Sequence, residues 1–252
     1  MAKLTRRLAA FAAPLAIILA VALPALADTY PVDDVADLVD DNIGDGICHT
    51  AMGTCSLRAA VQEANAHAGP DGITLPGGTF VLTQTGFGED NAVTGDLDIS
   101  GDLTVTGAGA ASTIIDGDAA DRVFDIKVLA GHAVQLAALT IQNGDARPSG
   151  ADGISSGGGI FIDDEATLNL TDVVVAANHA DSGGGINNYY GWLSVSGGAI
   201  LSNTSNYEGG GIGSGGYYYA YGGGGSAPTK ESSPLRVPGP ADEACCPTLP
   251  LK

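Results

Sequence analysis

The sequence has few basic residues: 10 of its 252 residues are Lys or Arg, against 29 Asp and Glu. A nucleic-acid-binding protein needs a basic face, which this composition does not supply. Glu is also scarce, at 6 residues, whereas coiled coils and helix bundles are rich in Glu, Lys, Ala and Leu and poor in Gly. The 38 glycines follow no three-residue period, which excludes collagen.

What the sequence does have in excess is Asp, Asn and Gly, including 23 Asp. These residues favour turns, so the composition predicts many short strands joined by tight turns. The length allows one or two domains.

The N-terminus has the pattern of an export signal. Basic residues without an acid precede an apolar run over residues 8–23, and Ala25-Leu26-Ala27 fits a small-x-small cleavage site. The sequence therefore predicts a secretory signal peptide over residues 1–27 and a mature chain that starts at Asp28. The alternative is a membrane anchor, because the apolar run is long enough. No later segment has the composition of a membrane span.

Removal of the signal changes the charge balance. Residues 28–252 contain 29 acids and 7 bases, a formal charge of −22. All of this excess lies in residues 28–212, with 26 acids and 4 bases, whereas residues 213–252 hold 3 of each. The mature chain therefore has an acidic body and a tail of different composition.

Four cysteines follow the signal. Export permits disulfides, so Cys48 and Cys55 are predicted to close a small ring that contributes about 2–3 kcal/mol. The alternative is a metal pair, but no His or Cys cluster nearby in the sequence completes four ligands. Cys245 and Cys246 are adjacent, and the sequence leaves their pairing open.

A repeat organises the body. Gly-Gly-Gly-Ile occurs at 157–160, 183–186 and 209–212, a spacing of 26 residues each time. Such a period is typical of a solenoid. Apolar residues two positions apart recur between the glycine runs, which predicts three short strands per repeat. The sequence thus predicts an all-β parallel β-helix of about five or six rungs.

Two asparagines, Asn178 and Asn203, occupy matching turns of this repeat. They either form a hydrogen-bonded ladder between rungs or are ordinary turn residues.

The first rung needs a cap, because an exposed rung is an open sheet edge. Residues 56–66 form the best helix candidate, with Ser56 as N-cap. Its apolar stripe comprises Leu57, Ala60, Val61 and Ala64. The side chains expected to face outward are Arg58, Gln62 and Glu63. The predicted organisation is a leader, disulfide loop and short capping helix over 28–70, β-helix over 71–212, and a disordered Gly/Tyr/Pro-rich tail over 213–252.

The tail breaks with the body in charge and pattern. A truncated or frame-shifted reading frame is the expected cause; alternatively, Tyr and Gly residues cover the last rung loosely.

The segment Cys55-Ser56-Leu57-Arg58-Ala59-Ala60-Val61-Gln62-Glu63-Ala64-Asn65 resembles the N-terminal signature of bacterial CSLREA-type secreted proteins. Ala59 departs from the acid of that motif. The same family is also resembled by three further segments, at residues 44–48 upstream and at 95–99 and 121–124 downstream. The resemblance as a whole covers about residues 28–212. The resemblance implies a right-handed, pectin-lyase-like β-helix exported to the cell surface or beyond, and many members look like adhesins. It implies no defined activity.

Some proteins of this fold cleave acidic polysaccharides, so catalytic residues must be considered. A hydrolase needs two or three carboxylates around the scissile bond, and a lyase needs a base and a calcium site. The candidate acids are Asp163, Asp164 and Glu165, and the candidate bases are Arg122, Lys127 and Arg147. The sequence favours a solvated turn for the acids and a surface face for Arg122 and Lys127. The negative body disfavours acidic polymers, so a structural, adhesive or binding role, with polysaccharide or cell-surface partners, is the main prediction. A lyase or hydrolase is the alternative.

Calcium is a candidate ligand of the acidic leader, although no cofactor is required. Residues 28–47 contain seven Asp and no base, and Asp37, Asp41 and Asp45 are the candidate ligands. Oxygen-rich loops suit Ca²⁺, but the spacing is not that of an EF-hand. The alternative is a solvated acidic segment.

Overall fold

The computed structural model describes residues 27–147, 155–214 and 217–221. Within these ranges the secondary structure is mostly strand, with one α-helix, α1 (Leu57–Ala66). No helix in this part of the chain is long and apolar enough to cross a membrane. The predicted signal peptide, Ala27 excepted, lies outside the described residues.

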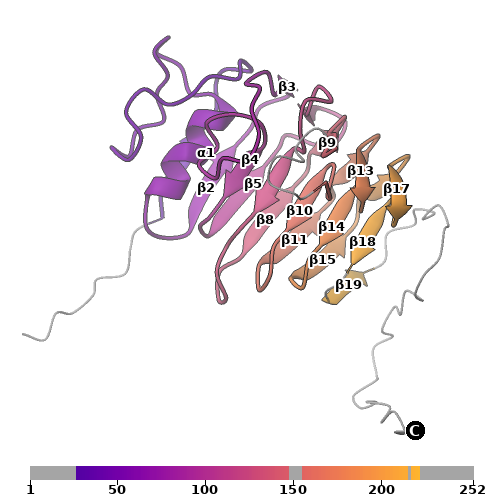
Figure 1. Cartoon of the computed structure of the whole chain (residues 1–252). Coiled ribbons are helices and arrows are strands. Elements are labelled where there is room, and N and C mark those ends of the chain that lie inside the picture. Colours follow the sequence, from indigo (N-terminus) through magenta and orange to yellow (C-terminus); the bar gives the residue numbers. More distant parts are fainter. Residues whose placement is uncertain (1–26, 148–154, 215–216, 222–252) are drawn as a thin grey trace, which may run out of the picture.

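Three parallel sheets make up most of the fold (Figure 1). The first sheet has seven strands, in the order β1 (Thr29–Pro31), β2 (Asp71–Thr74), β5 (Leu103–Thr106), β8 (Val134–Ala137), β11 (Thr167–Thr171), β15 (Trp192–Ser196) and β19 (Tyr217–Tyr221). The second sheet has five, in the order β4 (Leu97–Ile99), β7 (Phe124–Ile126), β10 (Ile160–Ile162), β14 (Ile186–Asn188) and β18 (Ile212–Ser214). The third sheet also has five, in the order β3 (Gly78–Val81), β6 (Thr113–Asp116), β9 (Thr140–Gln142), β12 (Val174–Ala176) and β16 (Ala199–Leu201). A separate pair joins β13 (His179–Ser182) to β17 (Thr204–Glu208).

The sheets are connected in a regular cycle. From β4 onward the chain passes from the second sheet to the first, then to the third, and returns to the second. Ile160 lies opposite Ile186, which lies opposite Ile212. The 26-residue repeat is therefore the interval between paired strands, and equivalent residues stack in columns.

The glycine runs occur where successive backbones approach closely. A Cβ on Gly158 would lie 2.2 Å from the carbonyl oxygen of His179, and one on Gly184 would lie 2.0 Å from that of Thr204. No side chain fits at either distance, so glycine is required there for space.

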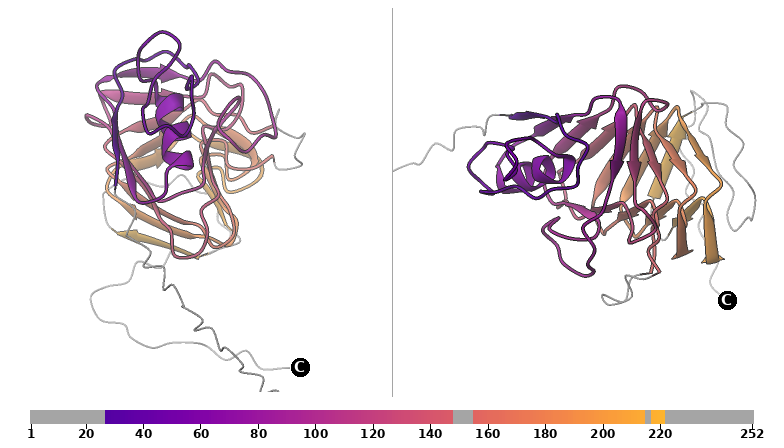
Figure 2. Two further views of the ribbon diagram at one scale, coloured as in Figure 1. Left: turned by 90° about the vertical axis from the view of Figure 1, so that its left-hand side faces the viewer. Right: turned by 90° about the horizontal axis from the view of Figure 1, so that it is seen from above.

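Inward-pointing apolar side chains form a single core cluster, with Leu97, Phe124, Ile160 and Leu168 all fully buried. Helix α1 lies across one end of this core, against β2 and β4 (Figure 2). The Ser56 side chain accepts a hydrogen bond from the Ala59 N–H at 3.1 Å, which caps the helix as the sequence predicts.

The prediction that Arg58, Gln62 and Glu63 face solvent is wrong, because all three are buried. Segments outside the helix supply their polar partners. Gln62 accepts from the Asp40 N–H and donates to the Ala92 carbonyl, and Glu63 accepts from two backbone N–H groups of the leader. The leader therefore covers the face of α1 that a surface helix would expose.

The disulfide between Cys48 and Cys55 is confirmed. Strands also continue beyond residue 212, since β19 pairs with β15 in the first sheet. The regular pattern thus extends into the segment predicted to be disordered. Residues 222–252, with Cys245 and Cys246, lie outside the described residues.

Candidate functional site

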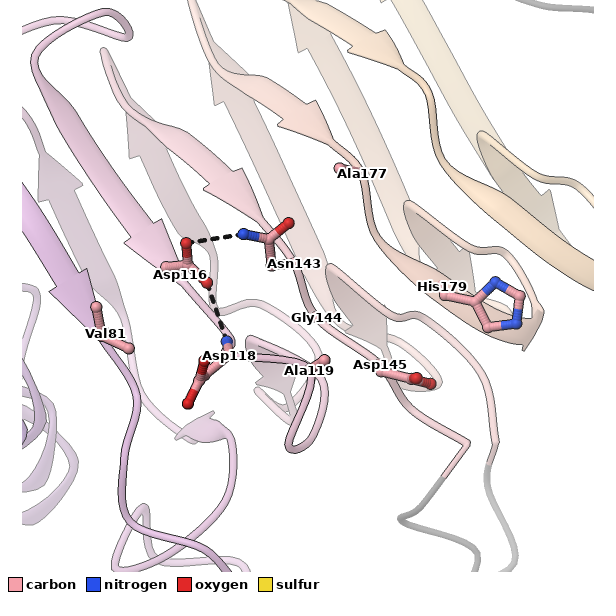
Figure 3. Close-up of a pocket in the computed structure, with 9 residues that line it drawn as sticks. All are labelled: Val81, Asp116, Asp118, Ala119, Asn143, Gly144, Asp145, Ala177 and His179. Atoms are coloured by element: carbon pink, nitrogen blue, oxygen red, sulfur yellow. Dashed lines mark hydrogen bonds between the residues drawn. The ribbon is translucent and has the colours of Figure 1, made fainter.

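A polar groove crosses the end of the third sheet (Figure 3). Its volume is about 350 Å³. It is lined by Val81, Asp116, Asp118, Ala119, Asn143, Gly144, Asp145, Ala177 and His179. These residues lie at or just after the ends of the paired strands β3, β6, β9 and β12, and His179 begins β13, which explains why residues so distant in sequence meet here.

The groove carboxylates are held by neighbouring groups. Asp116 Oδ2 accepts from Gln142 Nε2 and Asn143 Nδ2, both at 2.8 Å. Partial burial acts to raise the pKa of Asp145, but hydrogen bonds from Arg147 hold that pKa below its usual value. The arrangement offers fixed oxygen acceptors, and His179 directs its Nδ1 to the Thr204 hydroxyl.

A second polar cluster is buried on the outer face of the second sheet. The register aligns Asp98 of β4, Asp125 of β7 and Phe161 of β10 in one row. Each is at least 95% buried, since their exposed fractions are 1%, 3% and 4%. The segment between β3 and β4 covers this row, and its Ala92 N–H donates to Asp98 Oδ2 at 2.9 Å.

Two cations neutralise this row. Arg122 Nε lies 3.1 Å from Asp96 Oδ2, and its Nη1 lies 3.2 Å from Asp125 Oδ2. Lys127 Nζ lies 3.1 Å from Asp125 Oδ2 and 3.4 Å from Asp98 Oδ1. Oxygen atoms of Asp96, Asp98 and Asp125 lie within 4.8 Å of one another, close enough for a metal, but Arg122 and Lys127 already supply positive charge.

Burial dominates the protonation of the three carboxylates. It raises the pKa of Asp98 to about 6 and raises those of Asp96 and Asp125 despite the adjacent cations. Burial also acts to lower the pKa of Lys127, but the Asp125, Asp90 and Asp98 carboxylates raise it above its ordinary value. Lys127 therefore stays protonated near neutral pH and is a poor general base.

The candidate catalytic residues come together only in part: Arg122 and Lys127 both pair with Asp125, and the Asp163 N–H donates to the neighbouring Ile126 carbonyl at 3.0 Å. Arg122 is 1% exposed, so the alternative that it belongs to a surface face is wrong. Arg147 is paired with Asp145 at the edge of the groove. The acids at 163–165 form a turn between β10 and β11, with Asp164 and Glu165 exposed.

The predicted calcium ligands are likewise separated. Asp37 is buried against Arg58, Asp41 lies beside His49, and Asp45 accepts from Asn42 and the Ile47 N–H. These three acids do not form a metal-ligand group in the described structure. The reason is tertiary: Arg58, which the sequence places on an outer helix face, turns toward Asp37.

The two turn asparagines are joined by hydrogen bonds. Asn178 Nδ2 donates to Asn203 Oδ1 at 3.0 Å, and the Asn178 N–H donates to the same oxygen at 2.9 Å. Asn178 Oδ1 in turn accepts from the Gly144 N–H at 2.8 Å. The asparagines thus link three successive turns.

Sequence reasoning missed a group of exposed aromatic residues, which we call the aromatic turn: Tyr189, Tyr190 and Trp192. Tyr189 and Tyr190 follow β14, and Trp192 is the first residue of β15. Their exposed fractions are 51%, 54% and 45%. The signal was the run Tyr-Tyr-Gly-Trp between two strands, in a chain with 6% aromatic residues.

Comparison with known proteins yields no relative. No family model, no curated protein and no solved structure matches this chain.

Proposed function

We propose that this chain is an exported, right-handed parallel β-helix of the CSLREA type, which acts at the cell surface or outside the cell as a structural, adhesive or binding protein. The 26-residue repeat, the parallel pairing of equivalent strands and the helix across one end support an architecture of about five or six rungs. The signal-like residues 1–27 and the Cys48–Cys55 bond support export.

The aromatic turn carries the binding role. Large aromatic side chains seldom stand together in solvent, and an exposed apolar cluster commonly marks an interaction site. Tyr189, Tyr190 and Trp192 are about half exposed, although the core of the same strands is filled by aliphatic residues. Their exposure favours contact with an extracellular polysaccharide or a cell-surface component.

The alternative is a lyase or hydrolase acting on acidic polysaccharide. Arg122 and Lys127 are engaged in ion pairs, which argues against a free catalytic base. The excess negative charge of the body would also repel a polyanion. Calcium is not required by this proposal.

A polysaccharide and glycan array tests the proposal with purified residues 28–252, in the presence and absence of Ca²⁺. The expected result is binding to a subset of glycans without release of unsaturated or reducing ends. Release of such ends would establish the enzymatic alternative. Failure to bind any glycan or surface fraction of the producing cell would remove the binding role. N-terminal sequencing of the exported protein should begin at Asp28.

A further inference from the structure

The aromatic turn is supported from below by buried side chains. The Phe161 and Tyr189 rings are stacked, with centroids 6.3 Å apart and an interplanar angle of 21°. The Arg122 guanidinium carbon lies 5.4 Å from the Phe161 ring centroid on its face. Because Arg122 and Phe161 are 1% and 4% exposed, the stack is anchored in the protein. Tyr189 is therefore held in place before any ligand arrives.

Tyr190 adopts a backbone conformation that is unusual for a bulky residue. Its φ is 59°, and among the ten non-glycine residues with positive φ in the described chain it is the only aromatic one. Left-handed backbone costs on the order of 1 kcal/mol for such a residue. Its ring meets Tyr189 edge to face at 5.0 Å. The turn thus holds two exposed rings in fixed relative positions.

An acidic turn lies beside the aromatic turn. The Tyr189 N–H donates to the Ile162 carbonyl at 2.8 Å, and the Trp192 N–H donates to the Ala166 carbonyl at 2.7 Å. These bonds place residues 163–165 one strand spacing away, and Asp164 and Glu165 are exposed there. Hydrogen-bond acceptors of negative charge therefore border the exposed rings.

We propose that the aromatic turn and the bordering acids of residues 163–165 form a binding site for non-acidic glycans, that is, pyranose polymers without carboxylate or sulfate groups. The electron-rich ring faces attract the weakly positive C–H face of a pyranose. Carboxylates beside them accept hydrogen bonds from sugar hydroxyl or amino groups and repel acidic sugars. Pre-positioned rings lose little conformational freedom on binding. This inference rests on the proposed binding function and specifies its ligand class and site.

Fluorescence provides a direct test, because Trp192 is the only tryptophan of the chain. Residues 28–252 are titrated separately with neutral glucose oligomers, glucosamine oligomers and galacturonate oligomers. A shift of Trp192 emission is expected with one or both non-acidic series and not with galacturonate. The two non-acidic series distinguish recognition of hydroxyl groups from recognition of amino groups.

Two variants locate the effect. The double substitution Tyr189→Ala/Tyr190→Ala should weaken binding by about tenfold or more, as expected for aromatic anchors. Tyr207→Ala is the matched control, because Tyr207 is 77% exposed but lies on β17, outside the aromatic turn. Circular dichroism and melting temperature verify that both variants remain folded.

Two results would overturn the site. One is binding on the array with no change in Trp192 emission or with unchanged affinity of the double variant; the proposed binding function then stands without this site. The other is a preference for galacturonate over both non-acidic series. Absence of binding to every glycan and surface fraction would remove the site and the binding function together.

Discussion

Arg58 and Asp37 form an ion pair that is almost completely removed from solvent. Arg58 Nε lies 2.6 Å from Asp37 Oδ1, and Nη2 lies 3.2 Å from Oδ2, with side-chain exposures of 0% and 2%. The guanidinium also donates to the carbonyls of Ala92, Gly95 and Asp96. Asp37 accepts from the Thr83 and Gln84 N–H groups. One pair thus joins the leader, α1 and the segment between β3 and β4.

Replacement of Arg58 by alanine should destabilise the protein by about 3–5 kcal/mol, because it leaves a buried carboxylate without its cation. Urea denaturation measures the loss. Arg147→Ala is the control: Arg147 is 49% exposed in its pair with Asp145, so its loss should cost far less than that of Arg58. Similar losses for both variants would contradict a dominant role of the buried pair. If Arg58→Ala does not fold, Arg58→Lys keeps the charge but not the fork, and should still be measurably less stable.

The raised pKa of Asp98 predicts that the stability of the protein depends on pH. Burial raises its pKa from 3.8 to about 6, so the folded state binds a proton more tightly than the unfolded state. The stability gained from this tighter proton binding is fully present below the unfolded pKa of Asp98, and it is lost as the pH rises through about 6. The difference corresponds to about 3 kcal/mol.

As the pH rises from about 4 to about 7, Asp98→Asn should therefore gain stability relative to the unsubstituted protein by about 2 kcal/mol. Urea denaturation at both pH values measures the change. Asp164→Asn, at an exposed turn, controls for the altered net charge. A relative stability of the Asp98 variant that does not vary with pH would contradict the raised pKa.

Gly158→Ala should destabilise the fold by about 3 kcal/mol or more, because the new methyl group would collide with backbone that has no room to shift. The collision is with the His179 carbonyl, 2.2 Å away. Gly101→Ala is the matched substitution, since the nearest atom to its new carbon is 3.8 Å away. Thermal denaturation compares the two, and equal melting temperatures would refute the steric explanation of the repeat glycines.

Asn178→Ala should cost about 2–3 kcal/mol, because it leaves buried backbone groups without partners. Its side chain bonds the Gly144 N–H and the Ile141 carbonyl as well as Asn203. Asn206→Ala removes an exposed asparagine that bonds Asp181, and little effect is expected. If the two alanine variants unfold at the same denaturant concentration, the ladder contributes no special stability.

The sequence by itself determined the repeating part of the fold. The Gly-Gly-Gly-Ile runs predict which residues stack, because the same backbone conformation must recur for strands to pair in register, and Ile160, Ile186 and Ile212 do so. The Ser56 cap and the Cys48–Cys55 bond were also predictable, since both depend on residues close together in the chain.

Only the tertiary structure decided the environment of the charged and aromatic side chains. Arg58 and Arg122 are buried because segments distant in sequence cover them and supply carboxylate and carbonyl partners. The tertiary structure also gives Asp37, Asp41 and Asp45 different partners, and it leaves Tyr189 and Tyr190 exposed beside a buried Phe161. Strand periodicity shows which residues alternate, but it does not show what packs against an outward-pointing side chain.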